Sequence, residues 1–399
     1  MKNLRLTTYD SQLSIYIHYP FCKSKCPYCD FNSHVEKKID EEKFLQGYLN
    51  ELQYFAPQLK NRQVKTIFFG GGTPSLMPVY FVEKILAEIA KIWTIDKDCE
   101  ITLEANPTSF EATKFKAFKQ AGINRLSMGI QALNDVDLKF LGREHSALEA
   151  IKTIQTASKI FDNYSFDLIY ARPNQDLKSW EKELQNAIEL SANHLSLYQL
   201  TIEKGTKFYG QYLNKEFVLP DENLSADLYE LTNQITSQNG LELYEISNYA
   251  KAGFECKHNL AYWQSNDYLG IGAGAHSRVY LNDEKLRSAI IMLHQPAAWL
   301  EAALEKNVAI QKIEKVSQEE LLEEVILMGL RLKNGIDNAV FQKHFGKNIE
   351  QIFDLEKLEN LIKNNLIIVG KNNIKISSQG LILANSIIEK IIKLAHLAN

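Results

Sequence analysis

The sequence predicts an α/β protein: a parallel sheet with connecting helices in the first part of the chain, and a small domain after it. Three observations predict this. Short apolar runs alternate six times with longer amphipathic segments from residue 13 to about residue 250, which is typical of buried parallel strands and their crossover helices. The alternation ends after about residue 285. The chain has 399 residues, of which 45% are hydrophobic and 24% charged, a composition typical of folded globular proteins.

The six expected strands are rich in Ile, Leu, Phe, Tyr and Ser and contain few charges. They lie at residues 13–19, 65–69, 101–104, 125–130, 164–169 and 195–202. The helices between them repeat apolar residues at helical spacing and are expected at residues 40–55, 79–93, 110–120, 147–160, 179–190 and 224–238. Right-handed crossovers convert this order into a parallel sheet. The pattern alone does not choose between an open doubly wound sheet and a (β/α) barrel.

Residues 1–285 are therefore expected to form the main domain, and residues 286–399 a small helical, winged-helix-like domain. In the small domain, the pattern predicts helices at 319–332, 355–364 and 381–394, and a hairpin of strands at 366–369 and 374–377. Winged helices often bind DNA, which requires a basic excess. Residues 301–399 contain 13 Lys and Arg and 13 Asp and Glu, so we expect no nucleic-acid partner.

Charge and cysteine content narrow the cellular setting. The net charge is −4, and no run of about 18 apolar residues predicts a membrane-spanning helix. Residues 1–12 lack the apolar core of a signal peptide. An odd number of cysteines, five, argues against a disulfide framework. We therefore expect a cytoplasmic protein, with a peripheral association with the membrane left open.

Three of the five cysteines lie within eight residues, directly after the first expected strand. Cys22, Cys26 and Cys29 have the spacing C-x3-C-x2-C. Zinc sites usually combine two distant cysteine pairs, and this chain has no second pair. Three close thiolates instead suit a [4Fe–4S] cluster. One of the four irons is then left without a protein ligand and is open to a small molecule.

This cysteine spacing at the start of a predicted βα fold resembles the radical S-adenosylmethionine (SAM) superfamily. The resemblance implies a partial (β/α)6 barrel. It also implies that SAM binds the open iron through its amino and carboxylate groups, and that an electron from the cluster can cleave it to a radical.

The same resemblance implies a set of SAM contacts at the ends of the strands. A glycine-rich turn follows the second strand, where glycines permit a close backbone approach to a ligand. Asp167 stands inside an apolar strand, and a buried carboxylate needs partners. The implied SAM contacts are Tyr16, Tyr28, Gly71, Gly72, Thr73, Glu104, Gln131, Arg143 and Asp167.

Within the superfamily, the chain resembles the oxygen-independent coproporphyrinogen dehydrogenases and their relatives, the HemW-type heme chaperones. The matching stretches are residues 15–31, 69–75, 126–131, 141–146, 198–206 and 244–277. Two departures disfavour the dehydrogenase. Its fourth cysteine is replaced here by Phe31, and only 21 residues precede Cys22, where the dehydrogenase has a long extension.

The chaperone branch carries the motif H-N-x-x-Y-W, present here as His258, Asn259, Tyr262 and Trp263. A neutral imidazole is a common axial ligand of heme iron, and the two aromatic rings could flank a porphyrin. Residue types alone favour a core histidine beside a packed aromatic pair, and the resemblance reverses this preference. Cys256 and His276 are further candidate ligands. The C-x-x-C-H signature of covalent heme attachment is absent.

We therefore expect a heme chaperone that binds a [4Fe–4S] cluster, SAM and heme, and transfers heme to respiratory membrane enzymes. The alternative is an active radical SAM enzyme acting on a porphyrin such as coproporphyrinogen III. No catalytic residue is assigned, and a homodimer is left open. The loop at residues 170–174 contains less glycine than in many relatives, which leaves its shape undetermined.

Overall fold

The computed structural model describes residues 11–281 and 284–397, apart from the side chains of residues 109 and 110. Residues 1–10, which carry most of the expectation about a signal peptide, lie outside the described residues. Within the described ranges, no helix is long and apolar enough to cross a membrane.

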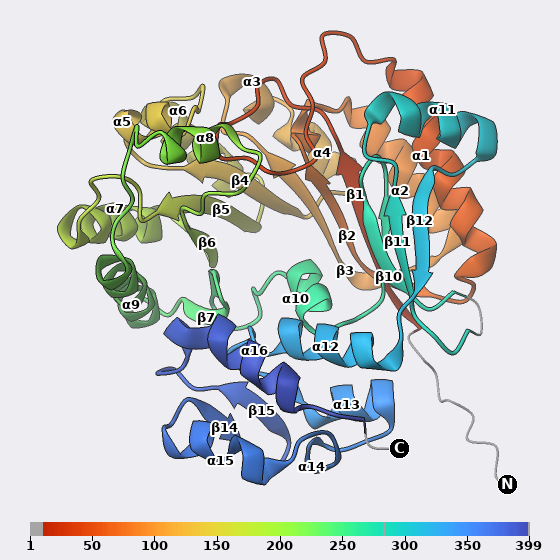
Figure 1. Ribbon diagram of the computed structural model, residues 1–399. Coiled ribbons are helices and arrows are strands. Elements are labelled where there is room, and N and C mark those ends of the chain that lie inside the picture. Colours follow the sequence, from red (N-terminus) through yellow and green to blue (C-terminus); the bar gives the residue numbers. More distant parts are fainter. Residues whose placement is uncertain (1–10, 282–283, 398–399) are drawn as a thin grey trace, which may run out of the picture.

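Six parallel strands form the centre of a large curved sheet and confirm the expected alternation (Figure 1). Neighbours in the sequence are neighbours in the sheet. The strands are β1 (Gln12–Tyr19), β2 (Gln63–Gly71), β3 (Thr94–Ala105), β4 (Arg125–Gln131), β5 (Asn163–Tyr170) and β6 (His194–Gln199). Since all six run in one direction, their carboxyl ends meet at one edge of the sheet, where ligands of α/β proteins usually bind.

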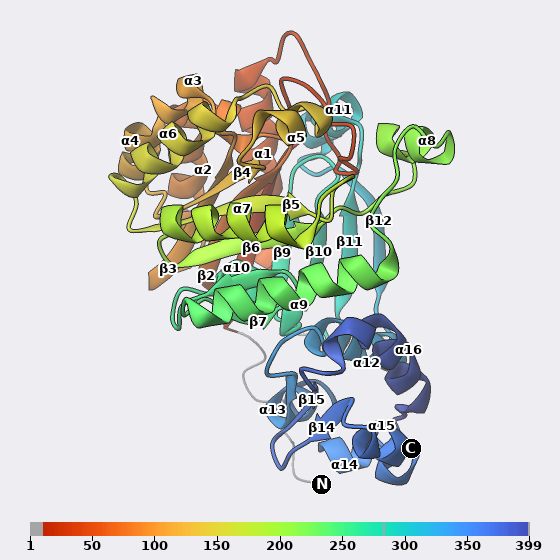
Figure 2. The ribbon, with the colours of Figure 1, turned by 90° about the vertical axis from the view of Figure 1, so that its left-hand side faces the viewer.

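The connecting helices lie around the outside of this sheet (Figures 1 and 2). Five of the six expected helices are found within a few residues of their predicted bounds: α1 (Glu41–Phe55), α2 (Val79–Ile92), α6 (Ala147–Ser158), α7 (Leu177–Leu190) and α9 (Glu222–Gln238). Two short helices were not expected, α5 (Asp135–Phe140) and α8 (Lys207–Leu213).

The sixth expected helix, at residues 110–120, is divided into α3 (Ser109–Ala112) and α4 (Phe115–Gln120). Side chains at the break bind other segments. Glu111 accepts from the hydroxyl of Ser75 and from the backbone N–H of Asn106. Lys114 donates to the carbonyls of Ser75 and Met77. These contacts hold the break against the turn after β2.

Six further strands extend the sheet at both sides, which the short sequence patterns did not predict. Beside β1 lie β9 (Tyr268–Ile271), β10 (His276–Val279), β11 (Ser288–Met292) and β12 (Ile310–Lys315), and beside β6 lie β8 (Asn248–Ala250) and β7 (Glu242–Glu245). No ladder between described residues joins β12 to β7. The sheet is therefore a partial barrel, as the resemblance implied. Helix α11 (Pro296–Lys306) packs on α1.

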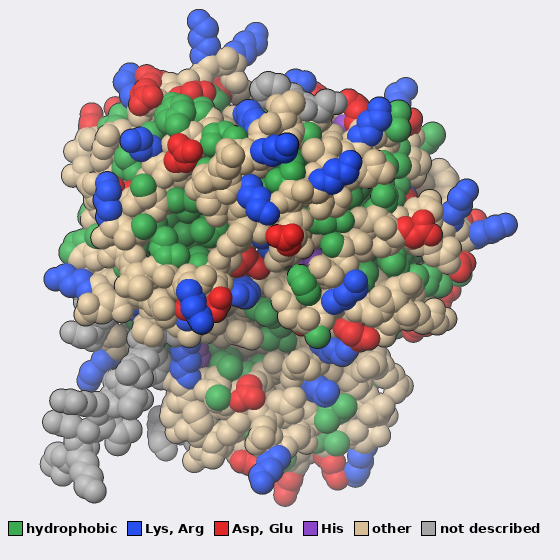
Figure 3. Space-filling model, turned by 180° about the vertical axis from the view of Figure 1, so that it is seen from behind, with side chains coloured by type: hydrophobic (Ala, Val, Ile, Leu, Met, Phe, Trp, Pro, Cys, Tyr) green, Lys and Arg blue, Asp and Glu red, His purple; other side chains and the backbone are tan. Residues whose placement is uncertain are grey.

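The C-terminal part forms a smaller lobe below the sheet (Figure 2). It contains a three-stranded sheet of β13 (Ile336–Asp337), β15 (Asn373–Ile376) and β14 (Ile367–Val369). Its helices are α12 (Gln318–Gly329), α13 (Asn338–Phe345), α14 (Ile349–Ile352), α15 (Leu355–Lys363) and α16 (Ala384–Leu394). The expected hairpin is present as β14 and β15. Lys, Arg, Asp and Glu side chains are interspersed on the face in Figure 3.

The lobe has its own hydrophobic core, which begins at Val316. Strands β11 and β12 belong to the main sheet although they follow residue 285. The division at residue 285 stays a prediction about folding units. Helix α10 (Lys257–Trp263) lies between the main sheet and this lobe, in contact with β2 and α12 (Figure 1).

Candidate functional site

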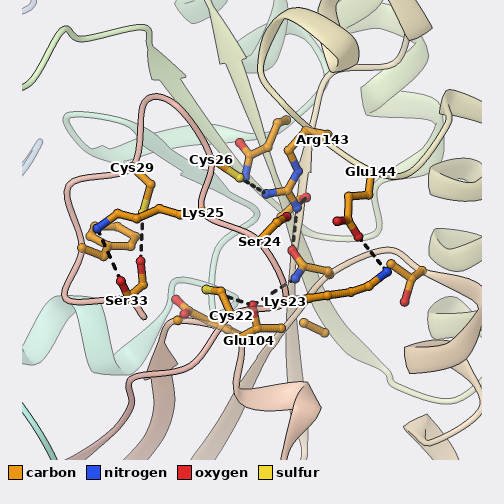
Figure 4. A pocket seen from close by; sticks show the side chains of 18 of the residues that line it. Cys22, Lys23, Ser24, Lys25, Cys26, Cys29, Ser33, Glu104, Arg143 and Glu144 are labelled. Carbon is orange, nitrogen blue, oxygen red and sulfur yellow. Dashed lines mark hydrogen bonds and ion pairs between the residues drawn. The ribbon is translucent and has the colours of Figure 1, made fainter. Parts of the chain in front are cut away.

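The three clustered cysteines line one cleft at the carboxyl ends of the parallel strands (Figure 4). Cys22, Cys26 and Cys29 are half-buried free thiols on the loop that follows β1. The loop is closed at its base, since the N–H of Cys22 donates to the carbonyl of His34 at 2.9 Å and the N–H of His34 donates to the carbonyl of Pro20 at 2.7 Å. The cysteines therefore lie on a closed loop rather than on a free strand end.

Each of the three sulfurs has a hydrogen-bonding neighbour. Arg143 Nη1 lies 3.2 Å from Cys26 Sγ, Thr73 Oγ1 lies 3.4 Å from Cys22 Sγ, and Ser33 Oγ lies 3.9 Å from Cys29 Sγ. Such donors are typical of iron–sulfur ligands and tune the potential of the cluster. Burial raises the pKa of Cys22 and of Cys29. Among the described side chains, no three His, Cys, Asp or Glu groups converge on a single ion. A cluster with a separate iron for each thiolate needs no such convergence.

Asn106, which the sequence analysis did not select, connects the surroundings of two of the cysteines. Its Nδ2 donates to Thr73 Oγ1 at 3.1 Å, and its Oδ1 accepts from Arg143 Nη2 at 2.5 Å. Thr73 and Arg143 in turn contact Cys22 and Cys26. Asn106 thus holds both sulfur donors in position. Asn106 could have been selected from the sequence, because it directly follows β3 and lies two residues after Glu104.

The glycine-rich turn after β2 packs against the start of the cysteine loop. The N–H of Gly72 donates to the carbonyl of Tyr19 at 2.7 Å, and the N–H of Thr73 donates to the carbonyl of Phe21 at 2.8 Å. A Cβ on Gly72 would lie 2.5 Å from the Phe21 oxygen. Gly71 has a φ of +110°, and a Cβ there would lie 2.7 Å from the His18 ring. Position 72 therefore requires glycine because a Cβ would have no space. Position 71 requires glycine for the same reason and also because its φ is positive.

Two half-buried carboxylates face the same cleft. Burial raises the pKa of Glu104 to about 8, with the neighbouring charge of Asp167 as a second cause, although the N–H of Gly71 donates to Glu104 at 3.2 Å. Burial likewise raises the pKa of Asp167 to about 6. Neither carboxylate is within ion-pair distance of a described cation. The charges of Arg125 and Arg143 act on them only from beyond ion-pair distance. Paired carboxylates without an ion-pair partner favour a positively charged ligand, and SAM carries a sulfonium and an ammonium group.

Most of the implied SAM contacts meet in this cleft. Gln131 has a φ of +73° at a register shift between β4 and β5, a strained backbone conformation of the kind that clusters at binding sites. Tyr16 is the exception, because it lines a neighbouring cavity, where its hydroxyl lies 3.1 Å from His18 Nδ1. The implied residues that line the cleft are Tyr28, Gly71, Gly72, Thr73, Glu104, Gln131, Arg143 and Asp167.

The neighbouring cavity has a volume of about 1010 Å³, at the upper end of the range of about 300–1,000 Å³ for ligand pockets. Asn259, Tyr262 and Trp263 of the H-N-x-x-Y-W motif line it. It shares four wall residues with the cleft: Lys25, Phe31, Gly71 and Glu104. A ligand bound there would therefore lie beside the cysteine loop.

His258, the first residue of the motif, is buried away from this cavity. Its Nδ1 lies 2.7 Å from Thr66 Oγ1 and its Nε2 lies 2.8 Å from the Tyr262 hydroxyl. The ring stacks on Phe68 with a centroid distance of 5.0 Å, and burial lowers the pKa of His258 to about 3. Both ring nitrogens thus have protein partners. Binding of heme iron by His258 stays a prediction, and it would require the Tyr262 hydroxyl to be displaced.

Cys256 is also buried. Its thiol donates to Glu100 Oε1 at 3.4 Å, and burial raises its pKa to about 12.

The loop at residues 170–174 is closed by Arg172, which is buried and forms ion pairs with Asp137, at 3.0 Å, and with Glu183. Ala171 has a φ of +55°, a conformation that glycine adopts more easily.

Comparisons with known proteins agree with this geometry. Residues 16–187 match the radical SAM superfamily, and residues 316–383 match the HemN C-terminal domain. The chain is 38% identical to heme chaperone HemW of Haemophilus influenzae over 94% of its own length and 97% of that protein. It is 34% identical to the mitochondrial radical S-adenosyl methionine domain-containing protein 1 of Bos taurus, over 94% of this chain and 86% of that one.

Among solved structures, coproporphyrinogen III oxidase (HemN) from Escherichia coli, a radical SAM enzyme, matches with a TM-score of 0.78. The match covers 97% of this chain and 91% of that one at 21% identity. At this identity, the likeness establishes the fold.

Proposed function

Because the chain belongs to the radical SAM superfamily, and within it to the family of the HemW heme chaperones, we propose that it binds heme and delivers it to acceptor proteins. The family also implies two resident cofactors, a [4Fe–4S] cluster and SAM. The observation that carries the proposal is the cavity of about 1010 Å³, with aromatic walls, beside the cysteine loop.

Cys22, Cys26 and Cys29 would hold the cluster, since they are the cysteines that line the cleft. Glu104 and Asp167 would face the positive groups of SAM. When bound, the two cofactors supply one-electron chemistry next to the cavity. The donors to the sulfurs, and the carboxylates without an ion-pair partner, support this assignment.

Heme would occupy the neighbouring cavity. Tyr262 and Trp263 on α10 provide aromatic surface, which suits the flat face of a porphyrin. Asn259 lies on the same wall. His258 would contribute by positioning α10, because one of its hydrogen bonds joins the helix to Thr66 on β2 and the other holds the Tyr262 hydroxyl of the same helix.

The acceptors would be heme-requiring respiratory enzymes of the membrane, reached from the cytoplasm by a peripheral association with the membrane. A homodimer would be one form of the protein.

Anaerobic reconstitution with iron and sulfide, followed by titration with hemin, tests the proposal. We expect an equimolar complex with a shifted Soret band, and transfer of its heme to an apo-cytochrome. Alanine at any of the three cysteines should abolish the iron–sulfur absorption. Matched Cys99→Ala protein should retain it, because Cys99 is buried on β3. Failure to bind hemin would refute the proposal.

An active radical SAM enzyme is the second candidate, because the cleft favours a cationic ligand whether or not SAM is consumed. Incubation with coproporphyrinogen III, SAM and a reductant separates the two. We expect no protoporphyrinogen, and Phe31 in place of a fourth cysteine supports that expectation. Sustained product formation would favour the enzyme.

A further inference from the structure

Two exposed histidines also line the large cavity: His276, a candidate ligand from the sequence, and His294, which the sequence analysis did not select. His276 begins β10, and His294 lies two residues after the end of the adjoining strand β11. Both line the cavity, and their ring centroids are 6.3 Å apart. No hydrogen bond joins either ring to another described residue.

We infer that the pair His276 and His294, rather than His258, supplies the axial imidazole ligation of the heme iron. This inference rests on the proposed heme binding and specifies its metal ligand. The ligand class is an iron porphyrin, and none of the described residues that line the cavity is a cysteine, so an imidazole is the metal ligand that this wall offers.

The contrast with His258 supports the assignment. A ligand must present an unshared nitrogen, and both nitrogens of His258 have partners in the protein. His258 is 1% exposed, whereas His276 and His294 are exposed at the edge of the cavity. A heme that must later leave for an acceptor is better bound at an exposed edge than inside the barrel.

The cysteine loop positions this pair. Asn32 on that loop donates through Nδ2 to the carbonyls of Ala273 and His294, each at 2.9 Å. The segments that carry the two histidines are also joined directly, because the N–H of Gly274 donates to the carbonyl of Leu293 at 2.9 Å. The backbone beside each histidine is thus held while the rings remain free.

The porphyrin would then lie between defined walls. Tyr262 and Trp263 line the cavity from α10, and Phe31, 61% exposed, lines it from the cysteine loop. These apolar rings should bind the macrocycle with or without iron. The histidines should add affinity only when iron is present.

Titration of the full-length protein with hemin and with metal-free protoporphyrin IX tests the inference. The variants are His276→Ala, His294→Ala, the double variant, and His258→Ala. His396→Ala is the matched control, an exposed histidine on the C-terminal lobe. Resonance Raman and electron paramagnetic resonance spectra report the axial ligand, and circular dichroism and thermal unfolding report folding.

We expect the double variant to lose at least about tenfold in hemin affinity, or about 1.4 kcal/mol, together with the imidazole signature. Its affinity for metal-free protoporphyrin and its unfolding midpoint should match those of wild type and His396→Ala. Unchanged hemin affinity and ligand spectrum in the folded double variant would overturn the inference but leave the proposed function standing. So would loss of the imidazole signature only in a folded His258→Ala protein. If wild type binds no hemin, both are overturned.

Discussion

The contact between the glycine-rich turn and the cysteine loop makes a sharp prediction for Gly72→Ala. The new Cβ would lie 2.5 Å from the oxygen, 2.8 Å from the carbon and 2.9 Å from the nitrogen of Phe21. All three are backbone atoms, so no side chain can rotate away. Overpacking of this kind costs about 1–3 kcal/mol. The hydrogen bonds from Gly72 and Thr73 would also lengthen, at about 1 kcal/mol each.

We therefore expect Gly72→Ala to lose about 3–5 kcal/mol of stability, measured by urea unfolding followed by circular dichroism. Because the displaced segment leads directly into Cys22, iron and sulfide content after reconstitution should fall as well. Gly210→Ala is the matched control. A Cβ there has no neighbour within 4 Å, and alanine should stabilise α8 by up to about 1 kcal/mol. If the two variants have equal unfolding midpoints and equal iron content, the steric reasoning is wrong.

Three further predictions concern the loops and carboxylates around the cleft. Ala171→Gly should raise stability by about 1 kcal/mol, because φ is +55° there; a lower urea midpoint would contradict this. Burial holds the pKa of Glu104 at about 8 in the folded protein. The ligand-free folded protein therefore keeps a proton that the unfolded chain releases at a lower pH. The free energy of unfolding should fall as the pH rises from about 5 to about 9. Glu104→Gln should reduce that fall in urea titrations at the two ends of the range, and an identical fall would refute the assignment. Arg172→Ala leaves the buried Glu183 and the half-buried Asp137 without their cation and should cost about 3–5 kcal/mol, whereas a loss within experimental error would show that the network does not stabilise the loops.

Local patterns in the sequence were sufficient to predict a segment whose own residues and uniform surroundings specify its structure. The apolar runs predicted the six parallel strands because such strands are buried on both faces. The three-cysteine spacing predicted that these thiols lie close together, because one loop carries all three. The division of the helix at residues 110–120 was missed, because Lys114 binds carbonyls at residues 75–77, outside its own helix.

The sequence by itself determined the α/β class and selected the three cysteines and eight of the implied SAM contacts that the structure brings together in one cleft. Only the tertiary structure decided which side chains of the H-N-x-x-Y-W motif reach the cavity, that Asn106 connects two sulfur donors, and that His276 stands beside His294. The physical reason is that side-chain direction on short segments depends on packing partners that are distant in sequence. Thr66 on β2 holds the His258 ring inside the barrel across 192 positions, and Asn32 holds the His294 backbone across 262.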